Sequence, residues 1–402
     1  MEKVALAFSG GLDTSVCVPL LEEEYGAAEV IGVTVDVGQP QAELDEAIET
    51  ARALDLEHHM VDETEAFAAL CLRSVRANAS YQGYPLGTAL ARPIIAQAIS
   101  EVAQAEGCDA LAHGCTGKGN DQLRFEAVWR RSSMEVVAPV RELGLTRAWE
   151  IEYAADRAIP VEAGNEGDWS IDANLWSRSI EGGELEDPTS IPPEEIYEWT
   201  APISSRPTEP AYLTIGFNEG VPVSIDGEAL DPVTLIEQLN DLGGRHGVGR
   251  NDLMEDRMLG LKVRSNYEHP AATILLMAHT ALEELVLTTD ERNFKRYVDD
   301  QWAQKAYEGL IDGPFIGALE GFIDTTQGRV TGAVTMLVHD GLARPVARDS
   351  EHAVYSKEAA SFNTETVHGI EQSDATGVAK YHGFQERFVS ESMREQQTDI
   401  EE

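Results

Sequence analysis

Short apolar runs alternate with amphipathic segments along the first 165 residues. The runs have the length and composition of buried strands, at 4–8, 29–37, 56–62, 109–113 and 135–140. Segments between them, such as 13–25, 42–54 and 89–106, repeat their apolar residues at helical spacing. This alternation predicts an α/β fold with a doubly wound, Rossmann-like parallel sheet that binds ligands at the carboxyl ends of its strands.

A different pattern begins after this region. Residues 187–210 hold six of the 17 prolines and show no clean periodicity, which predicts an extended connection. Beyond it we expect a second, α+β domain and a C-terminal helical arm that is frayed or docked on another subunit. The expected elements are a hairpin turning at 218–220, helices at 231–243, 270–288 and 290–309, and a meander of strands at 315–323, 328–338 and 341–348. The predicted domains are 1–165, 166–364 and 365–402.

Charge is the most unusual feature of the composition. The chain has 71 acidic and 30 basic residues, a formal net charge of −41. Such a field repels phosphate backbones and anionic lipid surfaces, so nucleic acid and membranes are not expected partners. A dispersed acidic surface with little lysine favours a halophilic cytoplasm, and an acidic mesophilic protein is the alternative. With neither a signal peptide nor a long apolar run apparent, we expect a cytoplasmic protein.

Residues 7–15 read AFSGGLDTS and join the first strand to the first helix. The glycines let an anion approach the main chain, the helix start offers free N–H groups, and Thr14 and Ser15 add hydroxyl donors. The lysine of a Walker A loop is missing, so we expect the loop to hold the β- and γ-phosphates of ATP as a departing pyrophosphate. A plain strand-to-helix turn with a Thr or Asp cap is the alternative. The predicted ATP-binding residues of this loop are Ala7, Phe8, Ser9, Gly10, Gly11, Leu12, Asp13, Thr14 and Ser15.

The S-G-G-L-D-T-S loop resembles the signature of the N-type ATP pyrophosphatases. Further stretches, found in order along nearly the whole chain, resemble the argininosuccinate synthase family. They are TVDVGQ (34–39), YPLGTALARP (84–93), HGCTGKGNDQLRFE (113–126), WSIDANLWSRSIEGGELEDP (169–188) and GVGRNDLMEDRMLGLKVRSNYEHPA (247–271). The resemblance implies the adenine nucleotide alpha hydrolase type of fold. It also implies ATP-dependent ligation of citrulline and aspartate through citrullyl-AMP, and a homotetramer.

The resemblance also assigns roles to residues outside the loop. ATP would contact Gly114 and Val35, and at the position of Val35 the family commonly has Ala. Aspartate would meet Thr116, Asn120 and Asp121. Citrulline would meet Tyr84, Thr88, Asn120, Arg124, Ser170, Ser179, Glu255 and Tyr267. Ala89 stands where many members have Ser, so a contact there would come from Thr88 or the backbone.

The residue types suit these roles. The Arg124 fork can bind a carboxylate in two places, although a salt bridge on a helix surface is the alternative. Glu255 offers a carboxylate for an ammonium group, and Tyr84 is either a ligand contact or a half-buried turn aromatic. Because Ser170, Ser179, Glu255 and Tyr267 follow residue 165, we expect the active site to lie between the two domains.

Several assignments stay open at the sequence level. No histidine has ligand spacing, so no protein-bound metal is predicted, and Mg²⁺ is expected to arrive with ATP. Asp13 could orient that ion or cap the helix, and Asp121 is a candidate base for the aspartate amine. Lys118 could contact a phosphate or carboxylate, and Cys115 is either a thiol nucleophile or a small buried residue. Amidation, RNA thiolation or a non-catalytic nucleotide sensor are the alternative functions.

Overall fold

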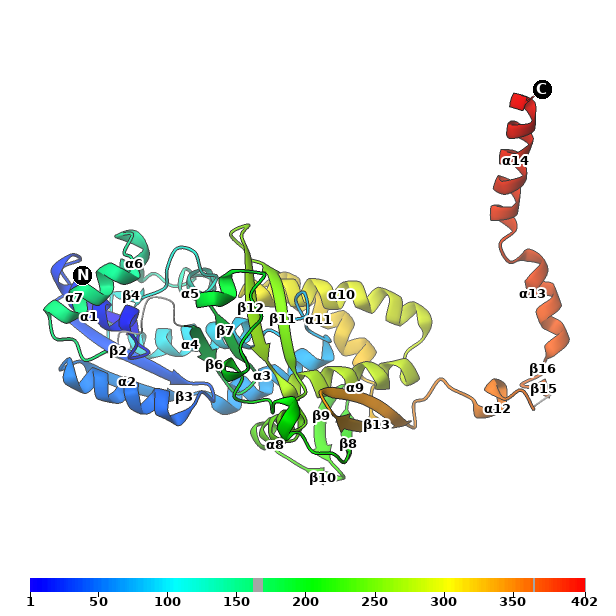
Figure 1. Ribbon diagram of the computed structural model, residues 1–402, viewed down its shortest axis with the longest axis horizontal. Helices are drawn as coiled ribbons and strands as arrows, with labels where there is room; N and C mark the ends of the chain where they lie inside the picture. The colour runs from blue at the N-terminus through cyan, green and yellow to red at the C-terminus, as the bar shows by residue number, and fades with distance from the viewer. Residues whose placement is uncertain (162–168, 364–365, 402) are drawn as a thin grey trace. The chain divides into compact units, whose positions relative to one another are not determined.

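A computed structural model describes residues 1–161, 169–363 and 366–401. The chain forms two units, residues 1–353 and residues 354–402 (Figure 1). The domain boundaries predicted at 165 and at 364 lie outside the described residues.

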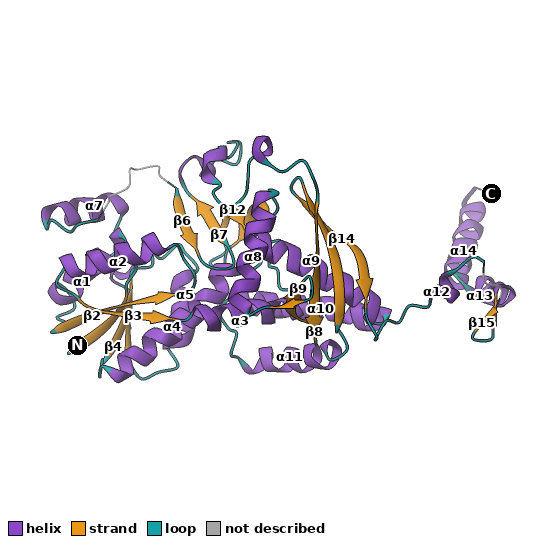
Figure 2. Cartoon of the chain, turned by 90° about the horizontal axis from the view of Figure 1, so that it is seen from below, coloured by secondary structure: helices purple, strands orange, loops and turns teal. Residues whose placement is uncertain are grey.

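The first 156 residues build a five-stranded parallel sheet in the order β3-β2-β1-β4-β5 (Figure 2). This confirms the predicted doubly wound α/β fold. The chain runs outward from β1 to β3 and then returns to β4 on the other side of β1, so the order reverses between β1 and β4. The elements are β1 Lys3–Ala7, α1 Leu12–Glu23, β2 Glu29–Asp36, α2 Gln41–Ala53, β3 Glu57–Asp62, α3 Thr64–Arg76, α4 Gly87–Ala105, β4 Ala110–His113, α5 Asp121–Trp129, β5 Glu135–Val137, α6 Pro139–Glu142 and α7 Arg147–Asp156.

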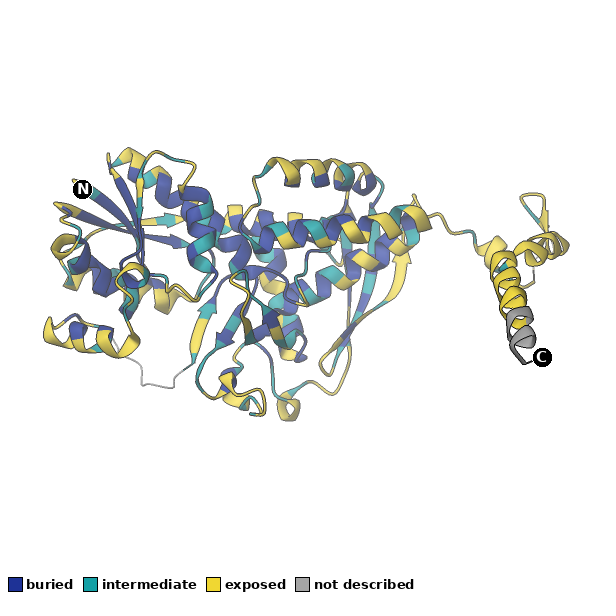
Figure 3. Ribbon diagram, turned by 90° about the horizontal axis from the view of Figure 1, so that it is seen from above, coloured by how far each residue is buried: buried dark blue, intermediate teal, exposed yellow. Residues whose placement is uncertain are grey.

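The alternation of side chains along β1 explains why both faces of this sheet are covered. Ala5 packs on one face, in a core shared with α3 and α4, whereas Val4 and Leu6 pack on the other, with Cys17 and Leu21 of α1. Both faces are therefore apolar, as a parallel sheet between two helical layers requires. The strands β1, β2 and β4 are largely buried (Figure 3), whereas β3, which was predicted to be a buried strand, lies at the edge of the sheet and is exposed or half-buried along its length.

Two antiparallel sheets follow within the same unit. One has the order β11-β12-β7-β6 and the other β10-β9-β8-β13-β14. Helices α8 and α9 pack against the second of these sheets. The elements are β6 Ser170–Ala173, β7 Arg178–Glu181, β8 Ala211–Asn218, β9 Val221–Ile225, β10 Glu228–Ala229, α8 Pro232–Arg245, β11 Arg250–Asp256, β12 Lys262–Glu268, α9 Pro270–Val286, α10 Thr289–Tyr307, α11 Pro314–Gln327, β13 Gly332–His339 and β14 Leu342–Asp349.

One predicted strand is wrong, and another is too long. Residues 315–323 belong to helix α11, which begins at Pro314 and buries Ile316, Leu319 and Ile323 at helical spacing. The strand predicted at 135–140 ends at Val137, because the chain turns into the short helix α6 at Pro139. The hairpin at 218–220, the three helices of the second region and the irregular segment 187–210, with its two 3-10 turns, are confirmed.

The second unit consists of short elements and one long helix. They are α12 Lys357–Ala360, β15 Thr366–Val367, β16 Ile370–Glu371, α13 Ala375–Tyr381 and α14 Phe384–Glu401, which confirms a helical C-terminal arm. Its side chains are largely exposed (Figure 3), among them Phe362 at 96% and Tyr381 at 77%. Among the helices that the structure describes, none combines the length and the apolar character needed to cross a bilayer.

Candidate active site

A cleft of about 710 Å³ opens at the carboxyl ends of β1, β2 and β4 and extends to sheet β11-β12-β7-β6. It lies where the strand order of the parallel sheet reverses, which is where such sheets bind ligands. All the predicted site residues line it except Gly10 and Ser15. The structure therefore gathers side chains that lie up to 260 residues apart in the sequence, from Ala7 to Tyr267.

The loop between β1 and α1 presents backbone N–H groups to this cleft. Gly11 is the N-cap of α1, and no side chain caps the helix, so the Thr or Asp cap is not formed. The first-turn N–H groups are thus left for a ligand, at the positive end of the helix dipole. The hydroxyl groups of Ser9 and Thr14 lie 3.1 Å apart in the same loop. This arrangement suits an anion with several oxygens.

Close packing of this loop requires glycine at one position and leaves little room for a side chain at another. Gly10 has φ +79°, and a Cβ built on it would lie 2.6 Å from Ala47 Cα in α2. A Cβ on Gly114, which follows β4, would lie 3.1 Å from the carbonyl carbon of Asp13. Ser15, in contrast, is fully buried, and its hydroxyl donates to Gly10 O. Its side chain therefore faces the protein and is not one of the hydroxyl donors of the cleft.

Asp13 stands in the first turn of α1, with Arg147 3.9 Å from its carboxylate. Burial raises the pKa of Asp13, and Arg147 only partly opposes this effect. Because Arg147 offsets so little of its negative charge, the Asp13 carboxylate can bind a further cation.

Two arginines hold Asp121 at the start of α5. Arg92 Nε donates to one oxygen at 2.8 Å, and Arg124 Nη1 donates to the other at 2.9 Å. Burial acts to raise the pKa of Asp121, but the two guanidinium groups together outweigh it and keep the pKa below its usual value. Arg92 also donates to Asp172 of β6, which accepts a second bond from the Thr88 hydroxyl. Asp121 therefore stays ionised between two guanidinium groups and is a poor proton acceptor.

A second polar network surrounds Glu255, which is 3% exposed. Its carboxylate accepts hydrogen bonds from the hydroxyl groups of Tyr267, at 2.8 Å, and of Tyr307. Asn120 Nδ2 donates to Tyr307 Oη at 2.7 Å. These contacts join β11, β12, α10 and the start of α5 around one side of the cleft.

Three further predicted residues line the cleft from strands β6 and β7 and from the loop after β4. Ser170 and Ser179 are on the neighbouring strands β6 and β7, and the Ser179 hydroxyl donates to Asp172 O at 3.3 Å. Thr116 is exposed in the loop after β4. Lys118 is exposed in the same loop and is not among the lining residues. Cys115 lines the cleft, and burial raises the pKa of its thiol, which favours the protonated form.

Sequence reasoning missed several residues of this site. Tyr307 comes from the end of α10 and stands 40 positions after Tyr267, so no motif spacing signals it. Arg92 and Asp172 lie inside stretches that carried the family resemblance, and those stretches could have pointed to them. The other missed lining residues with charged side chains are Glu43, Glu46, Arg147, Glu181 and Arg257.

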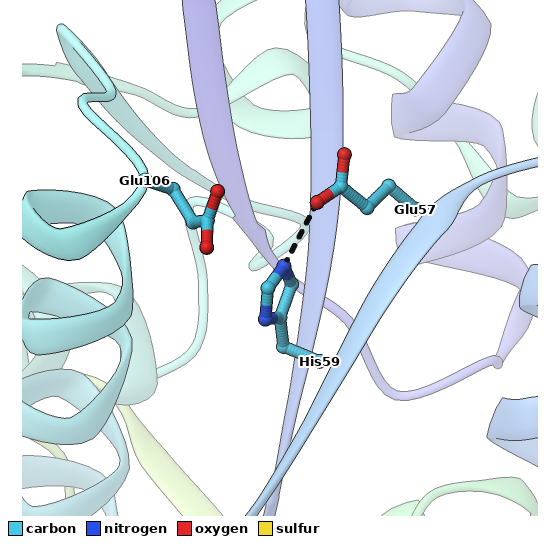
Figure 4. A group of neighbouring side chains, drawn as sticks. All are labelled: Glu57, His59 and Glu106. Carbon is cyan, nitrogen blue, oxygen red and sulfur yellow. Dashed lines mark hydrogen bonds and ion pairs between the residues drawn. The ribbon is translucent and has the colours of Figure 1, made fainter.

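Outside the cleft, Glu57, His59 and Glu106 point their side chains toward one another (Figure 4). Their ligand-type atoms lie within 4.8 Å of one another. However, Lys3 Nζ lies 3.4 Å from Glu106 and 3.9 Å from Glu57, so an ammonium group already offsets the acidic charge. We assign no metal to this cluster.

Comparison with known proteins identifies relatives along nearly the whole chain. Residues 3–160 match the Arginosuccinate synthase N-terminal HUP domain, and residues 169–389 match the Arginosuccinate synthase C-terminal domain. The argininosuccinate synthase of Natronomonas pharaonis is 69% identical over 96% of this chain and 96% of its own length. Those of Halobacterium salinarum and Haloquadratum walsbyi are 69% and 67% identical over 96% and 97% of this chain, and 97% and 98% of their own lengths.

Proposed function

The chain belongs to the argininosuccinate synthase family and joins citrulline to aspartate in an ATP-dependent reaction that gives argininosuccinate, and we propose that the cleft performs this reaction in two steps. In the first, the ureido oxygen of citrulline bonds to the α-phosphorus of ATP, and the bond to the β-phosphate oxygen breaks. Citrullyl-AMP and pyrophosphate result. In the second, the aspartate amine bonds to the ureido carbon, AMP departs, and the amine proton is released to water.

The loop of residues 9–14 would hold the β- and γ-phosphates. Its support is the uncapped N-terminus of α1, together with the two adjacent hydroxyl groups of Ser9 and Thr14. Donors fixed in place before the reaction stabilise the charge that develops on the departing pyrophosphate. Adenosine would lie against Val35 and Gly114, beside the apolar residues Val33 and Ile95 that also line the cleft.

Mg²⁺ would enter as part of the substrate, MgATP. Asp13 fits this ion because its carboxylate lies beside the phosphate loop and burial raises its pKa. A hard divalent cation prefers carboxylate oxygen and phosphate oxygen ligands, and it offsets the charge of the phosphates. Asp13 would orient the ion and would not itself react.

Citrulline and aspartate would occupy the part of the cleft nearest β6, β7, β11 and β12. Glu255 would bind the citrulline ammonium group, while Arg124, Ser170 and Ser179 would bind its carboxylate, beside Tyr84, Thr88 and Tyr267. Thr116, Asn120 and Asp121 would hold aspartate. Because two arginines lower the pKa of Asp121, we assign it an electrostatic role on the aspartate ammonium in place of the base role. Positioning would then supply most of the catalysis.

One observation carries this proposal: the phosphate loop, Asp121 and Glu255 all line a single cleft. Its test is rapid-mixing measurement of pyrophosphate release from MgATP. With citrulline alone we expect a burst that approaches one pyrophosphate per active site, since the adenylate stays bound, and with aspartate added we expect turnover. A burst that does not depend on citrulline would contradict the order of steps.

Two substitutions test the citrulline site and the aspartate site separately. Glu255→Gln is expected to raise the citrulline concentration needed for the burst by about tenfold or more, because the amide carries no charge for the ammonium group. Asp121→Asn is expected to keep the burst but to raise KM for aspartate. Glu237→Gln and Asp300→Asn, at exposed positions in α8 and α10, are the matched controls. Equal effects of both site variants on the burst would contradict the division of roles.

We further propose a halophilic, cytoplasmic homotetramer with the domains 1–165, 166–364 and 365–402. The charge of −41 supports the high-salt habitat. Exposed apolar side chains on the second unit, including Val378, Phe384 and Phe388, support an arm that docks on other subunits. Sedimentation equilibrium of the full chain in concentrated KCl tests the assembly, and Phe388→Asp is expected to weaken it.

A further inference from the structure

We propose that Tyr307 is a positioning residue that fixes Glu255 and Asn120 for the two amino-acid substrates. It does not line the cleft, and its side chain is 1% exposed at the last residue of α10. The inference rests on the roles proposed above for Glu255 and Asn120. Tyr307 acts through those side chains and does not touch substrate.

The direction of the hydrogen bonds follows from the chemistry of the three groups. A carboxylate oxygen only accepts, so the single hydroxyl proton of Tyr307 goes to Glu255 Oε1. Burial raises the pKa of Tyr307 well above its usual value, which keeps that proton in place. Tyr307 Oη must then accept from Asn120, whose Nδ2 donates at 2.7 Å.

This chain of bonds also fixes the orientation of the Asn120 amide. With Nδ2 toward Tyr307, Asn120 Oδ1 accepts from the backbone N–H of Met258 at 3.2 Å. The second Nδ2 hydrogen is the group that Asn120 has left to offer to the cleft. Tyr307 therefore sets which atom of Asn120 a substrate meets.

The ring and the backbone of Tyr307 are each held by a neighbouring side chain. It stacks on Tyr81 with ring centroids 3.8 Å apart and planes 15° from parallel, and Tyr81 Oη donates to the backbone oxygen of Asp256, next to Glu255. Arg124 Nε donates to Tyr307 O at 3.0 Å. Tyr307 thus contacts three residues of the proposed amino-acid sites, and its hydroxyl has little freedom to move.

The consequence for Glu255 is a carboxylate locked by one donor on each oxygen. Tyr307 occupies Oε1 and Tyr267 occupies Oε2, so the remaining lone pairs have a fixed direction before citrulline arrives. An ammonium group then binds without the cost of ordering the carboxylate. Loss of the Tyr307 hydroxyl should weaken only interactions made through Glu255 and Asn120.

The test is Tyr307→Phe, which keeps the ring stack and removes the hydroxyl. We expect KM for citrulline to rise by about tenfold or more and KM for ATP to stay within about twofold. The decisive probe is 5-ureidopentanoate, which is citrulline without its α-amino group, used as a competitive inhibitor. Because it lacks the ammonium group that Glu255 would bind, we expect its inhibition constant to change by less than about twofold.

Two further variants make the outcome specific. Tyr153→Phe removes a hydroxyl that donates to Glu23, outside the cleft, and is expected to leave all these constants unchanged. Adding Tyr307→Phe to Glu255→Gln is expected to raise KM for citrulline by much less than it does alone, because the two residues act together. Thermal unfolding of each variant measures any loss of fold separately.

If Tyr307→Phe weakens the binding of citrulline, of its analogue and of ATP to the same extent, the inference is overturned, since a purely structural role would have that effect. If Glu255→Gln distinguishes citrulline from the analogue and Tyr307→Phe does not, the inference alone is wrong. If Glu255→Gln does not distinguish them either, the proposed role of Glu255 is wrong and the inference about Tyr307 falls with it.

Discussion

The ring of Tyr84 stacks on the ring of Tyr267 with centroids 4.4 Å apart and planes 19° from parallel. Tyr84 precedes α4, which packs on the parallel sheet, and Tyr267 belongs to β12 of the neighbouring antiparallel sheet. The stack therefore joins the helical layer of the parallel sheet to the antiparallel sheet on the amino-acid side of the cleft. The Tyr84 hydroxyl also accepts a hydrogen bond from Thr88 N at 2.6 Å.

Two substitutions at Tyr84 separate the contributions of its ring and of its hydroxyl group to stability. Tyr84→Phe leaves the Thr88 N–H without its acceptor and should lower the free energy of unfolding by about 1 kcal/mol. Tyr84→Ala also removes the buried ring and should lower it by about 3–5 kcal/mol. Urea unfolding in concentrated KCl measures both values. Equal losses would mean that the stack contributes nothing to stability.

Gly10→Ala tests the packing of the phosphate loop. The new Cβ would lie 2.6 Å from Ala47 Cα, so the loop or α2 must move, and kcat/KM for ATP should fall by roughly 100-fold. Gly107→Ala is the matched control, because Gly107 has φ +70° with no atom within 4 Å of an added Cβ. The control should lose about 1 kcal/mol of stability and keep its activity. Similar activities of the two variants would show that the close packing is unimportant.

Glu150→Gln should be more stable than the native chain at alkaline pH. Glu150 is 3% exposed, one of its oxygens has no hydrogen bond, and burial, with Asp13 nearby, raises its pKa to about 7. In the unfolded chain its pKa is about 4.3, so between these values only the unfolded state ionises and native stability falls as pH rises. Glutamine does not ionise, so the variant does not lose stability in this way as pH rises.

The gain should be small near pH 4 and should reach about 3–4 kcal/mol near pH 8. Denaturant unfolding at several pH values measures it, with the exposed Glu237→Gln as control. A difference between variant and native chain that does not depend on pH would exclude titration of Glu150 as its cause.

Lys295→Met should destabilise the second half of the first unit. Lys295 is 1% exposed, and its Nζ lies 2.8 Å from Asp299 and 3.0 Å from Glu283. Its removal leaves two buried carboxylates together, so the free energy of unfolding should fall by about 3–5 kcal/mol. Lys262→Met breaks an exposed pair with Asp256 and should cost less than about 1 kcal/mol. Equal costs in denaturant unfolding would contradict the burial argument.

The midpoint of thermal unfolding should rise with KCl concentration. With a net charge of −41, the acidic side chains of the folded protein repel one another. Salt weakens this repulsion, because it shortens the Debye length from about 10 Å at 0.1 M to about 3 Å at 1 M. Calorimetry across this range measures the rise. An unchanged midpoint would mean that the acidic surface tolerates salt without needing it.

The parallel sheet could be predicted because most of its strands are short apolar runs, and such a run leaves a direct signal in the sequence. Residues 315–323 misled because FIGALEGFI is apolar enough for a strand, whereas Pro314 and the spacing of Ile316, Leu319 and Ile323 specify a helix. The residue types in a short run do not settle its period; its flanking residues do.

The residues of the candidate site that lie in recognisable motifs could be predicted. Those that reach the site only through the tertiary fold could not. Loop 9–15 and Asp121 stand in recognisable stretches. Tyr307 comes into contact with Asn120 only because α10 ends beside α5. Ser15 was wrongly expected to offer its hydroxyl to the cleft, because its place in the first turns of α1 directs the side chain into the core.

The permanently cationic side chains among the described lining residues of the cleft are Arg92, Arg124, Arg147 and Arg257, with no lysine. A guanidinium group keeps its proton across the whole range in which proteins stay folded, whereas an amine can lose its proton. The positive charges of the cleft are therefore indifferent to alkalinity. They also escape acetylation, which modifies the amine of lysine and would remove its charge.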